Sequence, residues 1–109
     1  MAYGVGMREV PLRPSLHVLV CTNRREPGDP LGPGCGDAGE RVYDAFKGEV
    51  DRTGAHRTHW VARTRCLGVC PKRGATVIVH PGAHVLADVE PADVSSVLIA
   101  AEERTTRGT

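Results

Sequence analysis

The chain has 109 residues, with 14 lysines and arginines against 13 acidic residues and a net charge of +1. This length indicates one domain, and the balanced charge argues against a nucleic-acid-binding or membrane-surface protein. No apolar run approaches the ~18 residues of a membrane span, and the first residues do not have the pattern of a signal peptide.

The N-terminal third predicts a tail, a buried strand and a long loop. Residues 1–14 contain two prolines and two glycines without periodicity, so we expect a flexible tail. The apolar run SLHVLVCT, residues 15–22, is typical of a buried strand that ends at Cys21. The next twelve residues hold three prolines and three glycines, which excludes a helix or a central strand. Since this loop lies between Cys21 and Cys35, we expect it to be tied down.

A helix is predicted to follow Cys35. Asp37 and Glu40 have the spacing of a capping box, and Gly54 favours a stop at the C-terminal end. Between them, the apolar residues that recur at helical spacing on one face are Val42, Ala45, Phe46 and Val50.

The C-terminal half predicts three strands and a second helix. The strands are expected at residues 58–66, 75–82 and 83–89. The Pro81-Gly82 turn joins the last two as a hairpin, and residues 91–106 predict the helix. This order of elements indicates an α/β fold, with helices packed on a small mixed sheet of four strands. We expect the domain to span residues 15–104, followed by a short tail at 105–109.

The candidate functional residues are the four cysteines: Cys21, Cys35, Cys66 and Cys70. The first two are separated by thirteen residues and the last two by three, and both pairs lie in loops after predicted strands. We expect a cytoplasmic protein, in which thiols stay reduced and indicate a metal site or catalysis before disulfides. Gly68 lets the backbone bend within the tight pair, so that sulfurs and backbone N–H groups can face one metal.

Spacing alone leaves several kinds of site open. A redox disulfide would favour two cysteines separated by two residues at a helix start, and would leave Cys21 and Cys35 unused. A structural zinc site usually has two tight pairs, and only one is present. Four buried cysteines without chemistry fit poorly with loops rich in glycine and proline. A 2Fe–2S cluster needs four thiolates, two per iron, although the spacing matches neither the plant-type nor the bacterial cysteine pattern.

The cysteine motifs nevertheless resemble those of one family. A strand that ends in cysteine, HVLVCTN, leads through a proline-containing loop into GPGCGDAGERV. The later segment TRCLGVCPKRGATVIVHPGAHVLADVEPADVSSVL contains a Cys-Leu-Gly-x-Cys element, a hydrophobic strand, a Pro-Gly hairpin and a final helix. Over residues 16–99 the chain therefore resembles the thioredoxin-like (Shethna-type) 2Fe–2S ferredoxins.

This resemblance implies a thioredoxin-like fold with a 2Fe–2S cluster bound by Cys21, Cys35, Cys66 and Cys70. It implies a one-electron carrier, not an enzyme, with redox proteins as partners and often a homodimer. Because the tight spacing suits one metal, we expect Cys66 and Cys70 on one iron and the other two cysteines on the second. The alternative function is a metal-stabilised binding, assembly or sensor protein, with zinc or a labile cluster and no electron-carrier role.

Two departures from the family pattern leave the four cysteines untouched. Lys72-Arg73-Gly74-Ala75 stands where the family commonly has Gly-Pro, and the aliphatic run HVLADV replaces an aromatic residue near the hairpin. Positive charge around the tight pair, from Arg65, Lys72 and Arg73, would favour a reduced cluster. These residues either dock an acidic partner or are simply solvated. In the long loop, two arginines are offset by two acidic residues: Arg24, Arg25, Glu26 and Asp29.

Overall fold

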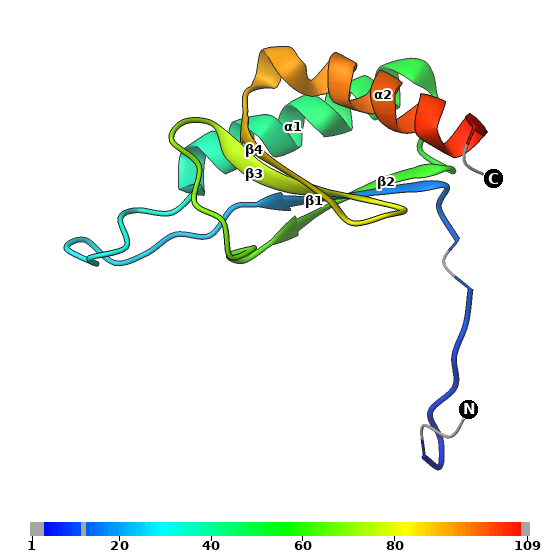
Figure 1. Cartoon of the computed structure of the whole chain (residues 1–109), viewed down its shortest axis with the longest axis horizontal. Coiled ribbons are helices and arrows are strands. Elements are labelled where there is room, and N and C mark those ends of the chain that lie inside the picture. The colour runs from blue at the N-terminus through cyan, green and yellow to red at the C-terminus, as the bar shows by residue number, and fades with distance from the viewer. Residues whose placement is uncertain (1–3, 12, 108–109) are drawn as a thin grey trace.

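The computed structural model describes residues 4–11 and 13–107, which form a four-stranded sheet with two α-helices on one face (Figure 1). The strands are β1 (Leu16–Cys21), β2 (His59–Thr64), β3 (Ala75–His80) and β4 (His84–Val89). The helices are α1 (Gly36–Thr53), the short 3-10 helix η1 (Pro91–Asp93) and α2 (Val94–Arg107). The predicted order of elements and the α/β class are confirmed. No helix among the described residues is long and apolar enough to cross a membrane.

The predicted tails lie partly outside the described residues, at positions 1–3, 12 and 108–109. Helix α2 extends to Arg107, beyond the start of the predicted C-terminal tail at residue 105. The division into a domain and two tails stays a prediction.

The sheet is mixed, as predicted, with the strand order β2-β1-β3-β4. Strands β1 and β2 run parallel and are connected through α1, while β3 is antiparallel to both β1 and β4. The turn after His80 joins β3 and β4 as the expected hairpin. Because β1 lies in the centre and pairs on both sides, its apolar run is buried where the sequence predicts a buried strand.

The hydrophobic core lies between the sheet and the two helices. Side chains alternate along the strands, and the buried residues of β1 and β3 include Leu16, Val18, Val20, Val77 and Val79. Helix α1 contributes Val42, Phe46 and Val50, which recur every four residues and are buried against the same cluster. This packing holds the start of α1 against the end of β1.

The other face of the sheet has no helix on it in the described part of the chain (Figure 1). Leu19 and Ile78 are paired neighbours in the centre of the sheet and are half-buried. Trp60 and Val85, on the flanking strands, are 42% and 48% exposed. The rings of His17 and Trp60 meet edge-on, with centres 6.4 Å apart. This face is therefore largely apolar and open.

The start of α1 differs from the prediction. The residue at the N-terminal cap is Cys35, not Asp37, and the helix has no side-chain cap there. Asp37 lies in the first turn and pairs with Arg24, while Glu40 pairs with Arg63 at 3.0 Å. The predicted capping box is therefore wrong, because these carboxylates bind arginines outside the helix. The end of α1 is as predicted, since Gly54 takes the left-handed conformation with φ of 72°.

Candidate metal centre

The four cysteines lie beyond one end of the sheet. Cys21 is the last residue of β1, and Cys35 immediately precedes α1. Cys66 and Cys70 lie in the loop between β2 and β3, at the same end, because β1 and β2 are parallel and β3 is antiparallel. All four belong to the described residues, and none of them forms a disulfide. Cys66 and Cys70 lie in a loop after a strand, as predicted, while Cys21 still belongs to β1 and Cys35 is the N-cap residue of α1.

Cys21 and Cys35 form the buried pair, with exposed fractions of 3% and 5%. The Cys35 thiol lies beside the Cys21 thiol and the backbone of Thr76, both of which influence its protonation. The hydroxyl of Thr76, itself fully buried, donates to the carbonyl of Val69 at 2.8 Å. Thr76 therefore connects the buried pair to the loop that carries the other two cysteines.

Burial raises the pKa of the Cys35 thiol from its ordinary value of 9.0 to about 11. The interaction with Cys21 adds to this rise in the pKa, while the backbone amide of Thr76 opposes it. Because a cysteine binds a metal as its thiolate, metal binding at Cys35 must release a proton.

We expect the thiols of the metal-free protein to react with iodoacetamide in the order of their exposure. The exposed Cys66 and Cys70 should react first and Cys35 last, because the thiolate is the nucleophile and Cys35 is buried and protonated near neutral pH. Raising the pH toward about 11 should speed the labelling of Cys35 by about tenfold per pH unit. Timed labelling followed by peptide mass spectrometry measures each rate.

Circular dichroism at each pH is the control for unfolding. A thiol pKa that is higher in the folded state than in the unfolded state stabilises the fold below pH 9.0. That contribution is lost as the pH rises from 9.0 toward about 11. Equal labelling rates for all four cysteines in the folded protein would contradict the division into a buried and an exposed pair.

Cys66 and Cys70 form the exposed pair. Gly68, between them, takes a φ of 85°, and its N–H donates to the Cys66 sulfur at 3.3 Å. The predicted bend of the backbone toward a sulfur is confirmed. The guanidinium nitrogen Nη2 of Arg25 lies 3.6 Å from both sulfurs, Cys66 Sγ and Cys70 Sγ. One cationic donor therefore joins the two thiols.

The long loop between Cys21 and Cys35 is tied down, as predicted. The N–H of Arg25 donates to the Pro33 carbonyl at 3.1 Å, and the N–H of Gly36 donates to the Asn23 carbonyl at 3.0 Å. Gly34 lies so close to Asn23 that a Cβ at this position would stand 2.3 Å from its carbonyl oxygen. The loop folds back on itself and holds Arg25 over the exposed pair. In the sequence, the charge of Arg25 is balanced by nearby acidic residues, and nothing there indicated that Arg25 contacts the two exposed cysteines.

A bulge in β4 places Asp88 beside the segment that follows Cys70. The register between β3 and β4 shifts opposite Thr76, and Asp88 takes a positive φ of 60°. Its carboxylate accepts the backbone N–H of Lys72 at 2.7 Å. Sequence reasoning missed this residue; an aspartate inside a strand, where the residue type is disfavoured, is the signal that could have found it.

Basic residues surround a hollow of about 310 Å³ beside Cys70. Arg25, Lys72 and Arg73 line it, and Arg73 also lies 3.9 Å from Glu90. Of the three predicted basic residues, Lys72 and Arg73 therefore lie at this hollow with Arg25, while Arg65 lines a different hollow beside Arg24 and Arg63.

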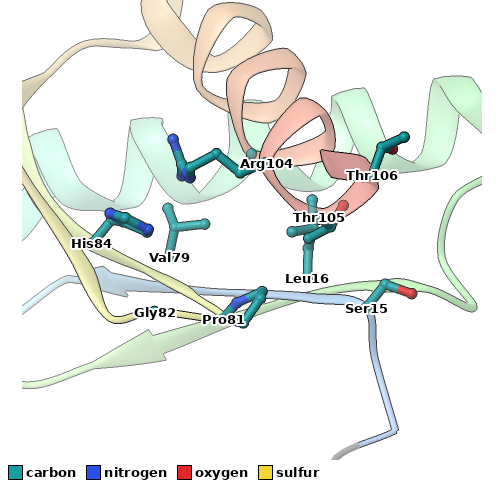
Figure 2. Close-up of a pocket in the computed structure, with 10 residues that line it drawn as sticks. Ser15, Leu16, Val79, Pro81, Gly82, His84, Arg104, Thr105 and Thr106 are labelled. Atoms are coloured by element: carbon teal, nitrogen blue, oxygen red, sulfur yellow. The ribbon is translucent and has the colours of Figure 1, made fainter. Parts of the chain in front are cut away.

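A larger cavity, of about 560 Å³, lies away from the cysteines (Figure 2). Its wall includes Leu16 at the start of β1, His84 at the start of β4 and Arg104 of α2. Because β1 begins at this cavity and ends at Cys21, the two regions lie at opposite ends of the sheet. The cavity therefore takes no part in the cysteine site.

The chemistry of the cysteine set fits an iron–sulfur cluster. Within residues 4–11 and 13–107, no three His, Cys, Asp or Glu side chains are grouped so that they could hold one metal ion. The four thiols lie in two pairs, and the backbone N–H of Gly68 donates to a sulfur of the exposed pair. Four thiols with hydrogen bonds to sulfur are the donor set of a 2Fe–2S cluster. Fold and site together define a small α/β protein of the iron–sulfur class.

Comparison with known proteins gives the family. No family model matches the chain. It is 32% identical over 84 residues to a 2Fe-2S ferredoxin from Aquifex aeolicus, which covers 75% of this chain and 74% of the relative. The crystal structure of the wild-type thioredoxin-like [2Fe-2S] ferredoxin from Aquifex aeolicus matches with a TM-score of 0.68 and 28% identity, over 85% of this chain and 87% of that one.

A cysteine-to-serine variant of the same Aquifex aeolicus ferredoxin matches with a TM-score of 0.68 and 26% identity, over 85% of this chain and 88% of that one. The chain belongs to the family of thioredoxin-like 2Fe–2S ferredoxins. The predicted family and the thioredoxin-like fold are confirmed.

Proposed function

We propose that the chain is a one-electron carrier that holds a single 2Fe–2S cluster through the thiolates of Cys21, Cys35, Cys66 and Cys70. Membership of the ferredoxin family supports the cofactor and the carrier function. The observation that supports this ligand set is the position of four free thiols, in a buried and an exposed pair, beyond the same end of the sheet. The protein then has no substrate of its own and is not an enzyme.

The two pairs have different tasks in this proposal. The buried pair, Cys21 and Cys35, binds one iron away from water, and the exposed pair, Cys66 and Cys70, binds the other at the surface. When bound, a 2Fe–2S cluster supplies one-electron chemistry whose potential the protein sets through charge, hydrogen bonds to sulfur and solvent access. The N–H of Gly68 is a donor to sulfur, and the exposed pair is the point where an electron enters and leaves.

Metal and sulfide analysis of the protein purified without oxygen tests this function. We expect about two iron atoms and about two acid-labile sulfides per chain, with a reddish-brown colour and a rhombic EPR signal on reduction. A colourless protein with zinc and no sulfide would overturn the proposal in favour of a metal-stabilised binding or sensor protein.

The partners in this proposal are redox proteins with an acidic docking surface. Arg65, Lys72 and Arg73 are exposed in the loop of the tight pair, and Val69 of the same loop is 43% exposed. Leu31, in the long loop between β1 and α1, is 70% exposed. An apolar centre with basic surroundings suits an acidic partner, because complementary charge speeds association.

We expect the rate of electron transfer to an anionic oxidant to fall with salt. Oxidation of the reduced protein by hexacyanoferrate(III), followed by stopped-flow absorbance, should slow several-fold between about 0.01 and about 0.15 M ionic strength, because the screening length falls from about 30 to about 8 Å. At low salt, Lys72→Gln should react more slowly than the wild type. Hexaamminecobalt(III), a cationic oxidant, is the control and should show the opposite salt dependence. The same salt dependence with both oxidants would contradict the docking role.

A homodimer is also part of the proposal. The open sheet face around Leu19, Trp60, Ile78 and Val85 offers apolar surface to a second copy of the chain. Sedimentation velocity decides the oligomeric state. A cytoplasmic location, expected from the cysteine usage, stays a prediction.

A further inference from the structure

We propose that Arg25 raises the reduction potential of the protein by donating hydrogen bonds from its guanidinium to the sulfurs of Cys66 and Cys70. This inference rests on the proposed function, because the potential belongs to the cluster that those sulfurs would hold.

The geometry holds the guanidinium in one place. Nη2 of Arg25 lies 3.6 Å from Cys66 Sγ and 3.6 Å from Cys70 Sγ, within the range of hydrogen bonds to sulfur. Nη1 donates to the carbonyl of Leu31 at 3.1 Å, which anchors the same group to its own loop. The backbone N–H of Arg25 is bound as well, to the Pro33 carbonyl. Hydrogen bonds therefore hold both the backbone and the guanidinium of Arg25, and the positive charge lies next to the two thiols.

Two other arginines of this region pair with carboxylates. Arg24, the next residue in the loop, pairs with Asp37 in the first turn of α1. Arg73 lies 3.9 Å from Glu90. Among the described residues, Arg25 is the basic side chain with a hydrogen bond to a cysteine sulfur. Its effect should therefore exceed that of the neighbouring basic side chains, for which the described residues show no hydrogen bond to a cysteine sulfur.

The sign of the effect follows from charge. Four thiolates around a 2Fe–2S cluster give a net charge of about −2, and one electron taken from an external reductant adds one negative charge without a proton. A positive donor stabilises the more negative state more strongly. Arginine stays protonated at any pH of interest, and contact with Cys70 raises its pKa further. Arg25 therefore favours the reduced protein.

A spectroscopic redox titration of Arg25→Gln tests this role. At a fixed potential, we expect the ratio of reduced to oxidised protein to fall roughly threefold to tenfold, a downward shift of up to about 59 mV for one electron. Arg25→Lys, which keeps the charge and loses the planar fork, should lie between the variant and the wild type. Arg24→Gln is the matched control, because it removes the same charge from the adjacent position, and it should shift the potential much less.

The outcomes separate this inference from the function on which it rests. Wild-type protein without iron and sulfide would refute the proposed function before any titration. A wild type that holds the cluster while Arg25→Gln and Arg24→Gln shift the potential equally would overturn the role of Arg25. If Arg25→Gln fails to hold the cluster, the titration of Arg25→Lys decides: a potential equal to that of the wild type contradicts the inference, and a lower one supports it.

Discussion

Alanine at position 35 should abolish binding of iron and sulfide. Cys35 is 5% exposed and lies at the junction of the long loop and α1, where neither water nor another side chain can easily replace its thiolate. An iron left with three ligands in a buried site loses a bond that nothing compensates. We expect Cys35→Ala, purified without oxygen, to contain less than about a tenth of the wild-type iron, with loss of the visible absorbance.

Cys70→Ser is the matched control for this variant. Cys70 is exposed, so a serine oxygen or a water molecule can reach the metal at this position. We expect a lower but measurable iron content, with changed absorbance, because an oxygen ligand replaces a sulfur. The crystal structures of cysteine-to-serine variants of the Aquifex aeolicus ferredoxin show that such exchanges are compatible with the fold in that protein. Equal iron contents in Cys35→Ala and Cys70→Ser would contradict the different tasks of the two pairs.

Much of the fold could be predicted from local patterns. The apolar run before Cys21, the helical spacing from Val42 to Val50 and the Pro81-Gly82 turn each depend on residues that are close in sequence, and the structure confirms all three. The placement of the cysteine pairs followed because strands β1 and β2 end at the same edge of the sheet. Local pattern failed at the start of α1, where Asp37 and Glu40 have the spacing of a capping box but bind arginines instead.

The support of the site could not be predicted in the same way. The contact of Arg25 with Cys70 joins residues that are 45 positions apart, and that of Asp88 with Lys72 joins residues 16 apart. Thr76 is an ordinary strand residue in the sequence, yet its amide and its hydroxyl connect both halves of the site. Such contacts depend on how loops close over the sheet, and a side-chain pattern along one segment holds no information about the segment opposite.

The second large effect is expected at a glycine that contacts the site through its backbone. Gly39 lies in the first turns of α1, and a Cβ there would stand 2.0 Å from the carbonyl oxygen of Cys21. No real structure tolerates this distance, so the helix must move away from β1. We expect Gly39→Ala to destabilise the metal-free protein by about 2–3 kcal/mol, as measured by chemical denaturation. Its iron content should fall as well, because Cys35 at the start of α1 moves with the helix.

Gly48→Ala, in the same helix, is the control that isolates this contact. Gly48 is exposed, and no atom of the described residues outside its own helix turn lies within 4 Å of a Cβ at this position. Alanine there should stabilise the protein by about 0.5–1 kcal/mol, because glycine disfavours a helix interior. The same gain in helix propensity applies at Gly39, so opposite signs for the two variants measure the close approach of helix and strand directly. Stabilisation by both substitutions would mean that α1 does not hold Cys35 beside Cys21 in the way the structure shows.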